Sequence, residues 1–213
     1  MERGVFYTPR PVVSYLVRSI HEILRSNFGL NDGLADVSTW GDVAARIPSL
    51  DIPSGTAMDQ PFVQILDPAT GTGTFLVETI DLIYKTVTRR WTAEGHSEAD
   101  REELWNAYVP AHLLPRLHGY ELLMAPYAIA HMKIGLKLYE TGYRFDSDER
   151  ARIFLTNSLE PGRDYSATLA FTVPALAHES AQVNSIKLNQ RYTVIIGNPP
   201  YSGLSSNMND WID

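Results

Sequence analysis

The sequence predicts an α/β protein built on a doubly wound, mostly parallel sheet. Short apolar runs of the kind that form buried parallel strands alternate with longer segments of helical periodicity. Such alternation favours βαβ units, and polar motifs follow three of the runs, where ligands bind in doubly wound sheets. The four predicted strands are 62–66, 117–121, 153–156 and 192–196. The three helices predicted between them are 74–91, 98–113 and 125–140.

The segment before the first strand is predicted to hold one long helix and then an irregular stretch. Apolar residues recur at helical spacing, and prolines at the start suit a first turn, so a helix over 10–28 is expected. Gly29 is a natural C-terminal cap for it. Residues 31–61 are rich in Pro and Gly. They are therefore expected to form a surface insertion with a short helix near 40–47.

Composition and charge limit the class of protein. The 213 residues are 44% hydrophobic and 20% charged, which is typical of a globular domain. They contain no Cys, which excludes disulfides, thiolate metal sites and a Cys nucleophile. The six His show no metal-ligand spacing, so no metal is expected. No run approaches the roughly 20 apolar residues of a membrane span, and we expect a cytoplasmic protein without a membrane partner.

The charge balance also bears on partners. Eighteen basic and 25 acidic residues give a net charge of −7 and a pI near 5.3. A chain that binds nucleic acid over its whole surface would be expected to carry a net positive charge. If the protein acts on DNA, most phosphate contacts should come from elsewhere.

The first polar motif covers residues 67–75, Asp-Pro-Ala-Thr-Gly-Thr-Gly-Thr-Phe, between a predicted strand and a predicted helix. Its two glycines allow a sharp turn and a close approach of backbone to ligand. Leu76 stands where a dinucleotide-binding loop would have a third Gly, and no Gly-Lys-Ser/Thr follows. Both a dinucleotide fingerprint and a phosphate-binding P-loop are therefore disfavoured. A plain strand-to-helix turn and a ligand-binding loop remain equally weighted interpretations of the two glycines.

The second motif, Gly119-Tyr120-Glu121-Leu122, lies at the end of the second predicted strand. In a doubly wound sheet, ligands bind beyond the carboxyl ends of the strands. An acidic residue at that edge can accept the hydroxyl protons of a ribose. Alone, Glu121 would be a solvated or capping carboxylate, but beside the glycine motif it favours a nucleoside site.

The third motif, Asn198-Pro199-Pro200-Tyr201, directly follows the last apolar run. Two successive prolines lack N–H groups, so the segment leaves the sheet with fixed φ angles. Asn198 and the Pro199 carbonyl then offer hydrogen-bond acceptors in a rigid arrangement. Tyr201 offers a flat face for stacking. This motif is the most specific feature of the chain.

Taken in order, the motifs resemble those of the γ-class N6-adenine DNA methyltransferases of restriction–modification systems. The methyltransferase region of single-chain Type ISP enzymes is the most similar variety, followed by Type I modification subunits, and the stretch 119–138 adds to the likeness. The matching blocks are 4–9 (Gly-Val-Phe-Tyr-Thr-Pro), 67–75, 119–122, 155–159 and 198–201. The resemblance implies a Rossmann-like methyltransferase fold, S-adenosyl-L-methionine as cofactor, and double-stranded DNA as the partner that is methylated.

The resemblance also implies cofactor-binding roles for the matched positions. Glu121 would hold the ribose hydroxyls and Leu122 would lie against the adenine. Asn157 stands where many relatives have an Asp that contacts the adenine amino group, and Asn keeps an acceptor oxygen. The positions expected near the methionine end of the cofactor are Tyr7, Thr8 and Pro9. Those expected around its amino-acid part are Asp67, Pro68, Ala69, Gly71 and Gly73.

The implied catalytic residues are Asn198, Pro199, Pro200 and Tyr201. The N6 amino group of adenine is a poor nucleophile because its lone pair is delocalised into the ring. Acceptors at Asn198 and Pro199 would take its two hydrogens and favour a lone pair aimed at the methyl group. The adenine must be flipped out of the duplex to reach such a site, and Tyr201 would stack on it.

Other interpretations stay open. Cytosine-C5 methylation is excluded by the lack of Cys, and enzymes that methylate cytosine N4 usually carry Ser in place of Asn198. Protein-glutamine and RNA-base N-methyltransferases share the Asn-Pro-Pro-Tyr motif. A different class of hypothesis is a cofactor-binding fragment without independent activity.

The expected organisation is a methyltransferase catalytic domain over 1–213. It would comprise the helix 10–28, the insertion 31–61, a cofactor half over 62–160 and the start of a catalytic half over 190–213. The resemblance implies that the sheet is incomplete at its C-terminal end and that a target-recognition domain is absent. The remaining parts of a larger restriction–modification polypeptide or complex are therefore expected partners.

Overall fold

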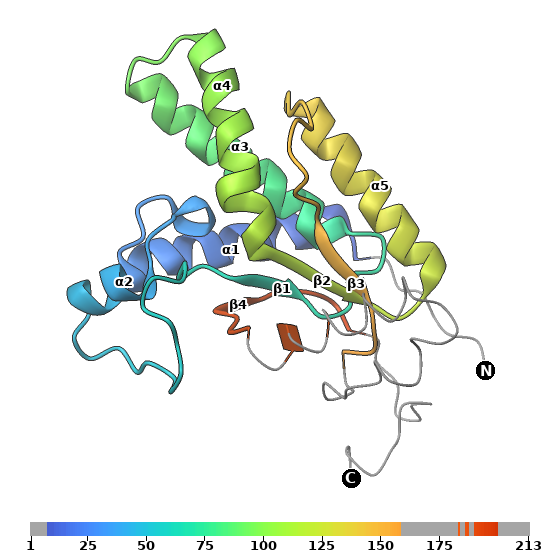
Figure 1. Cartoon of the computed structure of the whole chain (residues 1–213), viewed down its shortest axis with the longest axis horizontal. Helices are drawn as coiled ribbons and strands as arrows, with labels where there is room; N and C mark the ends of the chain where they lie inside the picture. Colours follow the sequence, from blue (N-terminus) through green and yellow to red (C-terminus); the bar gives the residue numbers. More distant parts are fainter. Residues whose placement is uncertain (1–7, 159–182, 184–185, 188–189, 200–213) are drawn as a thin grey trace.

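The computed structural model describes residues 8–158, 183, 186–187 and 190–199. These residues contain four parallel strands in the order β3-β2-β1-β4. The strands are β1 (Ile65–Asp67), β2 (Leu117–Glu121), β3 (Arg152–Leu155) and β4 (Val194–Ile195). The chain moves outward from β1 to β3, and β4 then pairs with the other side of β1 (Figure 1). This reversal of strand order gives the predicted Rossmann-like α/β fold, with its switch point between β1 and β4.

Hydrogen-bonded pairing sets the strand ends differently from the apolar runs. The prediction for β2 is confirmed residue for residue, and β3 is displaced by one residue. β1 begins three residues later than predicted, although Phe62 and Val63 are buried. β4 covers two residues of the predicted five, because only Val194 and Ile195 are in register with β1. An apolar run in the sequence indicates which residues are buried. The ends of a strand depend instead on where a neighbouring strand forms backbone hydrogen bonds with it.

Three long helices pack on one face of the sheet: α1 (Arg10–Phe28), α3 (Thr74–Ala93) and α5 (Met124–Glu140) (Figure 1). The prediction for α1 is confirmed at both ends, with Gly29 as a left-handed cap at φ 64°. The predicted helix over 98–113 is α-helical only in α4 (Glu98–Tyr108) and continues as a π turn, Val109–Leu113, and a 3-10 turn, Leu114–Arg116. Pro110 lacks the N–H that would continue the α-helical ladder.

The insertion over 31–61 is only partly a surface segment, so that prediction was wrong in one respect. It forms the short 3-10 helix η1 (Gly33–Ala35) and the predicted short helix α2 (Trp40–Arg46), which begins with a capping box between Thr39 and Asp42. Trp40 and Val43 are buried in the main core. The segment around Trp40 therefore packs on the core, whereas residues 44–60 are half-buried or exposed, as expected of a surface segment.

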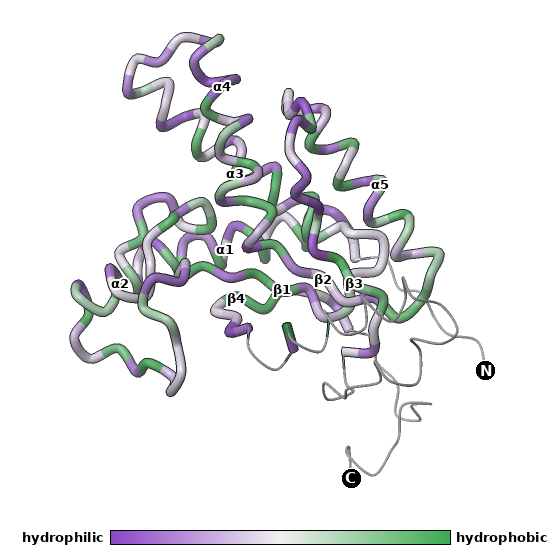
Figure 2. Tube along the Cα trace, in the orientation of Figure 1, coloured by the Kyte–Doolittle hydropathy of each residue, from purple (hydrophilic) through white to green (hydrophobic). Residues whose placement is uncertain are grey.

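Apolar side chains fill both faces of the sheet. Figure 2 shows hydrophobic residues in β1 and β3, and an alternation of hydrophobic and hydrophilic residues along the long helices. The larger core lies between the sheet and the helices. A smaller cluster on the other face holds Leu66, Tyr120 and Phe154 against Val183. Within the described ranges, no helix is long and apolar enough to cross a membrane.

Candidate cofactor edge of the sheet

The glycine loop, residues 67–75, turns the chain from β1 into α3. Gly71 and Gly73 both have positive φ, 54° and 78°, a conformation that side-chain-bearing residues rarely adopt. Gly73 also packs against α5, since a Cβ atom there would lie 3.3 Å from the Cα of Ala130. The Gly73 N–H donates to the Thr70 carbonyl at 2.8 Å and closes the turn. Both glycines are thus required by backbone geometry.

Glu121 ties this loop to the neighbouring strand. Its Oε2 accepts a hydrogen bond from the Gly71 N–H at 2.8 Å, and its Oε1 accepts one from the Leu123 N–H at 2.8 Å. A second bond runs beside them, from the Thr70 N–H to the Tyr120 carbonyl at 2.9 Å. Glu121 is 9% exposed. The prediction that the glycine motif and Glu121 lie together is confirmed, and a carboxylate with two bonds retains further acceptor positions.

Asp67, the last residue of β1, is fully buried beneath the glycine loop. Its Oδ1 accepts a hydrogen bond from the Ala69 N–H at 3.1 Å. Its Oδ2 has no hydrogen-bond partner in the part of the chain that the structure describes. Burial, with a smaller contribution from the Glu121 carboxylate, raises the pKa of Asp67 to about 7. The group therefore titrates near neutral pH.

The carboxyl end of β4 brings Asn198 to the same edge. The Asn198 Nδ2 donates to the Thr8 Oγ1 at 3.0 Å, although 190 residues separate the two positions. Gly197 allows this approach, because a Cβ atom there would overlap the Asp67 carboxylate and lie 3.2 Å from the Pro68 Cδ. With its nitrogen engaged by Thr8, the Asn198 amide turns its oxygen away from that bond. The predicted methionine-end and catalytic positions thus meet.

Asn157 follows β3 on the far side of β2. The turn it occupies is fixed by the Thr156 N–H, which donates to the Glu121 carbonyl at 2.8 Å. Asn157 is half-buried, and Leu122 is 44% exposed. The structure therefore places these two residues at the same edge as Glu121.

The remaining predicted residues divide into two groups. Pro9 is the N-cap residue of α1, and its carbonyl accepts hydrogen bonds from the N–H groups of the first turn. Pro199 is exposed directly after Asn198. Three predicted site residues lie outside the described residues: Tyr7, Pro200 and Tyr201.

Two lysines at this edge were missed by sequence reasoning. The Lys133 Nζ, on α5, lies 3.3 Å from the hydroxyl oxygens of both Thr72 and Thr74, and burial lowers its pKa. The Lys187 Nζ donates to the Thr156 hydroxyl and to the Asn157 carbonyl. Lys187 lies outside every matched block. Lys133 lies in the stretch 119–138 but after the motif 119–122, so motif spacing carried no signal for either lysine.

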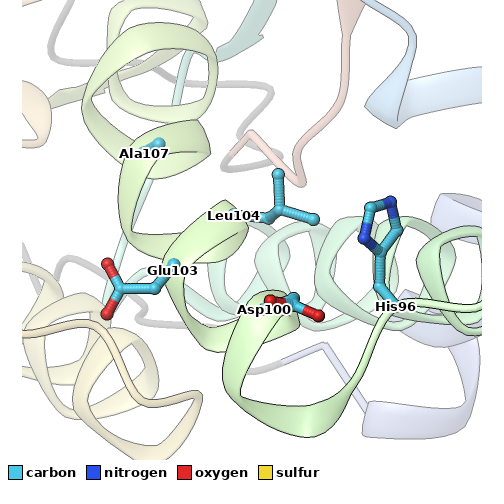
Figure 3. Close-up of a pocket in the computed structure, with 5 residues that line it drawn as sticks. All are labelled: His96, Asp100, Glu103, Leu104 and Ala107. Carbon is cyan, nitrogen blue, oxygen red and sulfur yellow. The ribbon is translucent and has the colours of Figure 1, made fainter.

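A separate pocket of about 480 Å³ lies along α4, lined by His96, Asp100, Glu103, Leu104 and Ala107. Its polar side chains do not converge on a common point, and Glu103 points away from His96 (Figure 3). Glu103 instead forms two hydrogen bonds with Arg144, and Asp100 caps α4 through Ser97. None of the predicted site residues lines this pocket, so it does not coincide with the candidate site. Among the residues described, no group of three His, Asp or Glu side chains could hold a metal ion.

These observations define a class: a Rossmann-like α/β protein whose glycine loop, acidic strand end and Asn-Pro segment share the ligand edge of the sheet. No protein-family model matches the chain, and no curated protein matches it. Solved structures do match it over 97% of its length.

The similar structures are large restriction–modification proteins and a protein–DNA complex. The ATP-dependent Type ISP restriction-modification enzyme LlaBIII, bound to DNA, has a TM-score of 0.59 and 25% identity. A nuclease-deletion mutant of the Type ISP enzyme LlaGI, in complex with a DNA substrate mimic, has a TM-score of 0.57 and 26% identity. The DrdV–DNA complex has a TM-score of 0.55 and 26% identity. This chain spans 11%, 13% and 15% of those chains, respectively.

Proposed function

We propose that the chain is the methyltransferase portion of a restriction–modification enzyme, which transfers a methyl group from S-adenosyl-L-methionine to N6 of an adenine flipped out of DNA. The observation that carries this proposal is the assembly at the carboxyl edge. Glu121 is bonded to the glycine loop on one side of the switch point. Asn198 is bonded to Thr8 on the other side. In this proposal, Glu121 and the glycine loop would bind the nucleoside and Asn198 would activate the nucleophile, and their position at one edge supports a shared site.

The chemistry of the available groups fits S-adenosylmethionine. The ribose hydroxyls would donate to the remaining acceptor positions of Glu121. The Asp67 Oδ2, buried without a partner among the described residues, suits a cationic or N–H-bearing ligand group. Gly71 leaves room above the loop, since a Cβ atom there would meet only the Ala69 carbonyl at 3.9 Å. The cofactor supplies an electrophilic methyl group on a sulfonium.

Asn198 and Pro199 would prepare the adenine amino group. The bond from the Asn198 nitrogen to Thr8 fixes the amide orientation, which leaves the oxygen to accept one N6 hydrogen. The Pro199 carbonyl would accept the other. Two fixed acceptors oppose delocalisation of the N6 lone pair into the ring and stabilise the positive charge that develops on N6 during transfer. Stacking of the flipped adenine on Tyr201 remains an expectation.

The role on DNA follows from two further observations. The similar structures named above contain DNA or a DNA substrate mimic. This chain carries a net charge of −7 and corresponds to a small fraction of those proteins. We therefore propose that other parts of a larger polypeptide supply most phosphate contacts and the target recognition, because nonspecific DNA binding depends on clustered basic residues.

Methyl transfer by the complete enzyme of which we propose this chain is a part, from tritiated S-adenosylmethionine to duplex DNA, RNA and a glutamine-bearing protein, tests the proposal. We expect the label on adenine N6 of DNA, and Asn198→Ala should abolish transfer with little change in cofactor affinity, as for an interaction made in the transition state. Asn27→Ala, which removes an exposed amide in the last turn of α1, is the matched control. Label on RNA or glutamine would favour the corresponding rival enzyme. Cofactor binding without transfer to any acceptor would favour the cofactor-binding fragment.

A further inference from the structure

The Lys187 ammonium lies beside Thr156 and Asn157, the residues that follow β3. It approaches them from the face of the sheet opposite α3 and α5. Its Nζ donates to the Thr156 Oγ1 at 2.9 Å and to the Asn157 carbonyl at 2.6 Å. The same ammonium lies 5.6 Å from the centroid of the Tyr120 ring. Tyr120 immediately precedes Glu121 on β2. One cationic side chain thus contacts the ends of both strands beside the ligand edge.

These contacts hold the turn that contains Asn157. From the side of β2, the turn is held by the bond between the Thr156 N–H and the Glu121 carbonyl. From the opposite face it is held by Lys187. Hydrogen bonds from an ammonium group are shorter and stronger than those between neutral groups. A ring face within 6 Å adds a cation–π attraction that centres the ammonium. The backbone at Asn157 is therefore fixed from two directions.

The segment that carries Lys187 is itself anchored to β2. The hydroxyl groups of Tyr192 and Tyr120 are hydrogen-bonded at 3.0 Å. Val183 and Ile186 pack into the cluster around Tyr120. Lys187 therefore directly follows a residue that is packed against the Tyr120 cluster, and this contact fixes the position from which its ammonium holds the Asn157 turn.

We propose that Lys187 is a positioning residue for the purine end of the cofactor pocket. It acts through Asn157, whose backbone it holds beside the strand end that carries Glu121. This proposal rests on the function proposed above, because it assumes that Asn157 and Glu121 bind one nucleoside. The proposal predicts that loss of Lys187 affects one part of the pocket only. Recognition of the adenosine part should weaken, and the contacts of the glycine loop should stay intact.

The test compares two ligands, S-adenosylhomocysteine and adenosine, by isothermal titration calorimetry on the 213-residue chain. Lys187→Met removes the ammonium but keeps the apolar stem, and we expect both ligands to bind about tenfold more weakly, by the same factor. Lys187→Arg should recover part of the affinity. Lys137→Met, which removes an ammonium paired with Asp81 and Glu140 on the helical face, is the matched control and should leave both affinities unchanged.

Two results would overturn the proposal. One is an adenosine affinity within twofold of wild type in folded Lys187→Met. The other is an equal loss of affinity in Lys137→Met, which would indicate a general effect of stability. Gly73→Ala is expected to give a different result. Strain in the glycine loop should weaken the binding of S-adenosylhomocysteine more than the binding of adenosine.

A ligand-free measurement separates this proposal from the proposed function. The Thr156 amide should exchange with deuterium faster in Lys187→Met than in wild type, while amides of α4 should not change. If wild type binds neither ligand, the proposed function fails, and the positioning role is then judged by this exchange alone. Equal Thr156 exchange in the two proteins refutes the positioning role whatever the binding result.

Discussion

Asp67 makes the stability of the protein depend on pH in a defined direction. Its carboxyl is fully buried, and burial raises the pKa from the ordinary 3.8 to about 7 in the folded chain. Between these two values the native state holds a proton that the unfolded state has released. Stability therefore falls as pH rises from about 4 to about 7, and the full contribution of the group is lost above pH 7.

The size of the effect follows from the two pKa values. Each pH unit in this window changes the free energy of unfolding by about 1.4 kcal/mol, and the whole interval corresponds to about 4 kcal/mol. Asp67→Asn removes the titration but keeps an oxygen that can accept the Ala69 N–H. The variant should thus gain stability relative to wild type as pH rises from 5 to 8.

Urea unfolding followed by tryptophan fluorescence at pH 5, 6, 7 and 8 measures this difference. Asp51→Asn, at an exposed position, controls for the change in net charge. If the free energies of unfolding of wild type and Asp67→Asn follow parallel curves over that range, the reasoning about the buried carboxyl is wrong.

Three further substitutions probe the same edge. Gly197→Ala should destabilise the chain by about 1–3 kcal/mol in urea unfolding, because the new methyl group overlaps the Asp67 carboxylate; unchanged stability would contradict the close approach. Thr8→Val should lower the single-turnover rate of methyl transfer, measured at saturating cofactor, by about tenfold, since one hydrogen bond orients Asn198; an unaltered rate would remove Thr8 from the account. Lys133→Met should speed amide exchange at 71–75 without changing exchange in α4, because the contacts of Lys133 with Thr72 and Thr74 are lost. Equal exchange in wild type and Lys133→Met would show that Lys133 does not stabilise the loop.

The elements that carry their own local signals were predictable from the sequence. α1 begins after Pro9 and ends at Gly29 because proline and left-handed glycine are local terminators. The adjacency of Glu121 and Gly71 could also be expected, since the carboxyl ends of neighbouring parallel strands share an edge. The prediction for α1 depends only on geometry within a few residues. The prediction for Glu121 and Gly71 depends on the pairing of two neighbouring strands.

What could not be predicted depends on tertiary contacts. The bond between Thr8 and Asn198 joins residues 190 positions apart, and no local pattern encodes it. Lys133 lies one helical turn beyond Ala130, yet its contact with the glycine loop depends on how α5 crosses α3. Burial of Trp40 contradicts the Pro- and Gly-rich composition around it, because packing against Phe62 outweighs local propensity.

The most direct test of the central claim, a cofactor pocket made by the glycine loop and Glu121, is calorimetric binding of S-adenosylhomocysteine to wild type and Glu121→Ala. Glu103→Ala, which removes an exposed carboxylate paired with Arg144, is the matched control. The account predicts binding by wild type and by the control, and at least a tenfold loss of affinity in folded Glu121→Ala. No binding by wild type, or equal affinity in all three proteins, would contradict it.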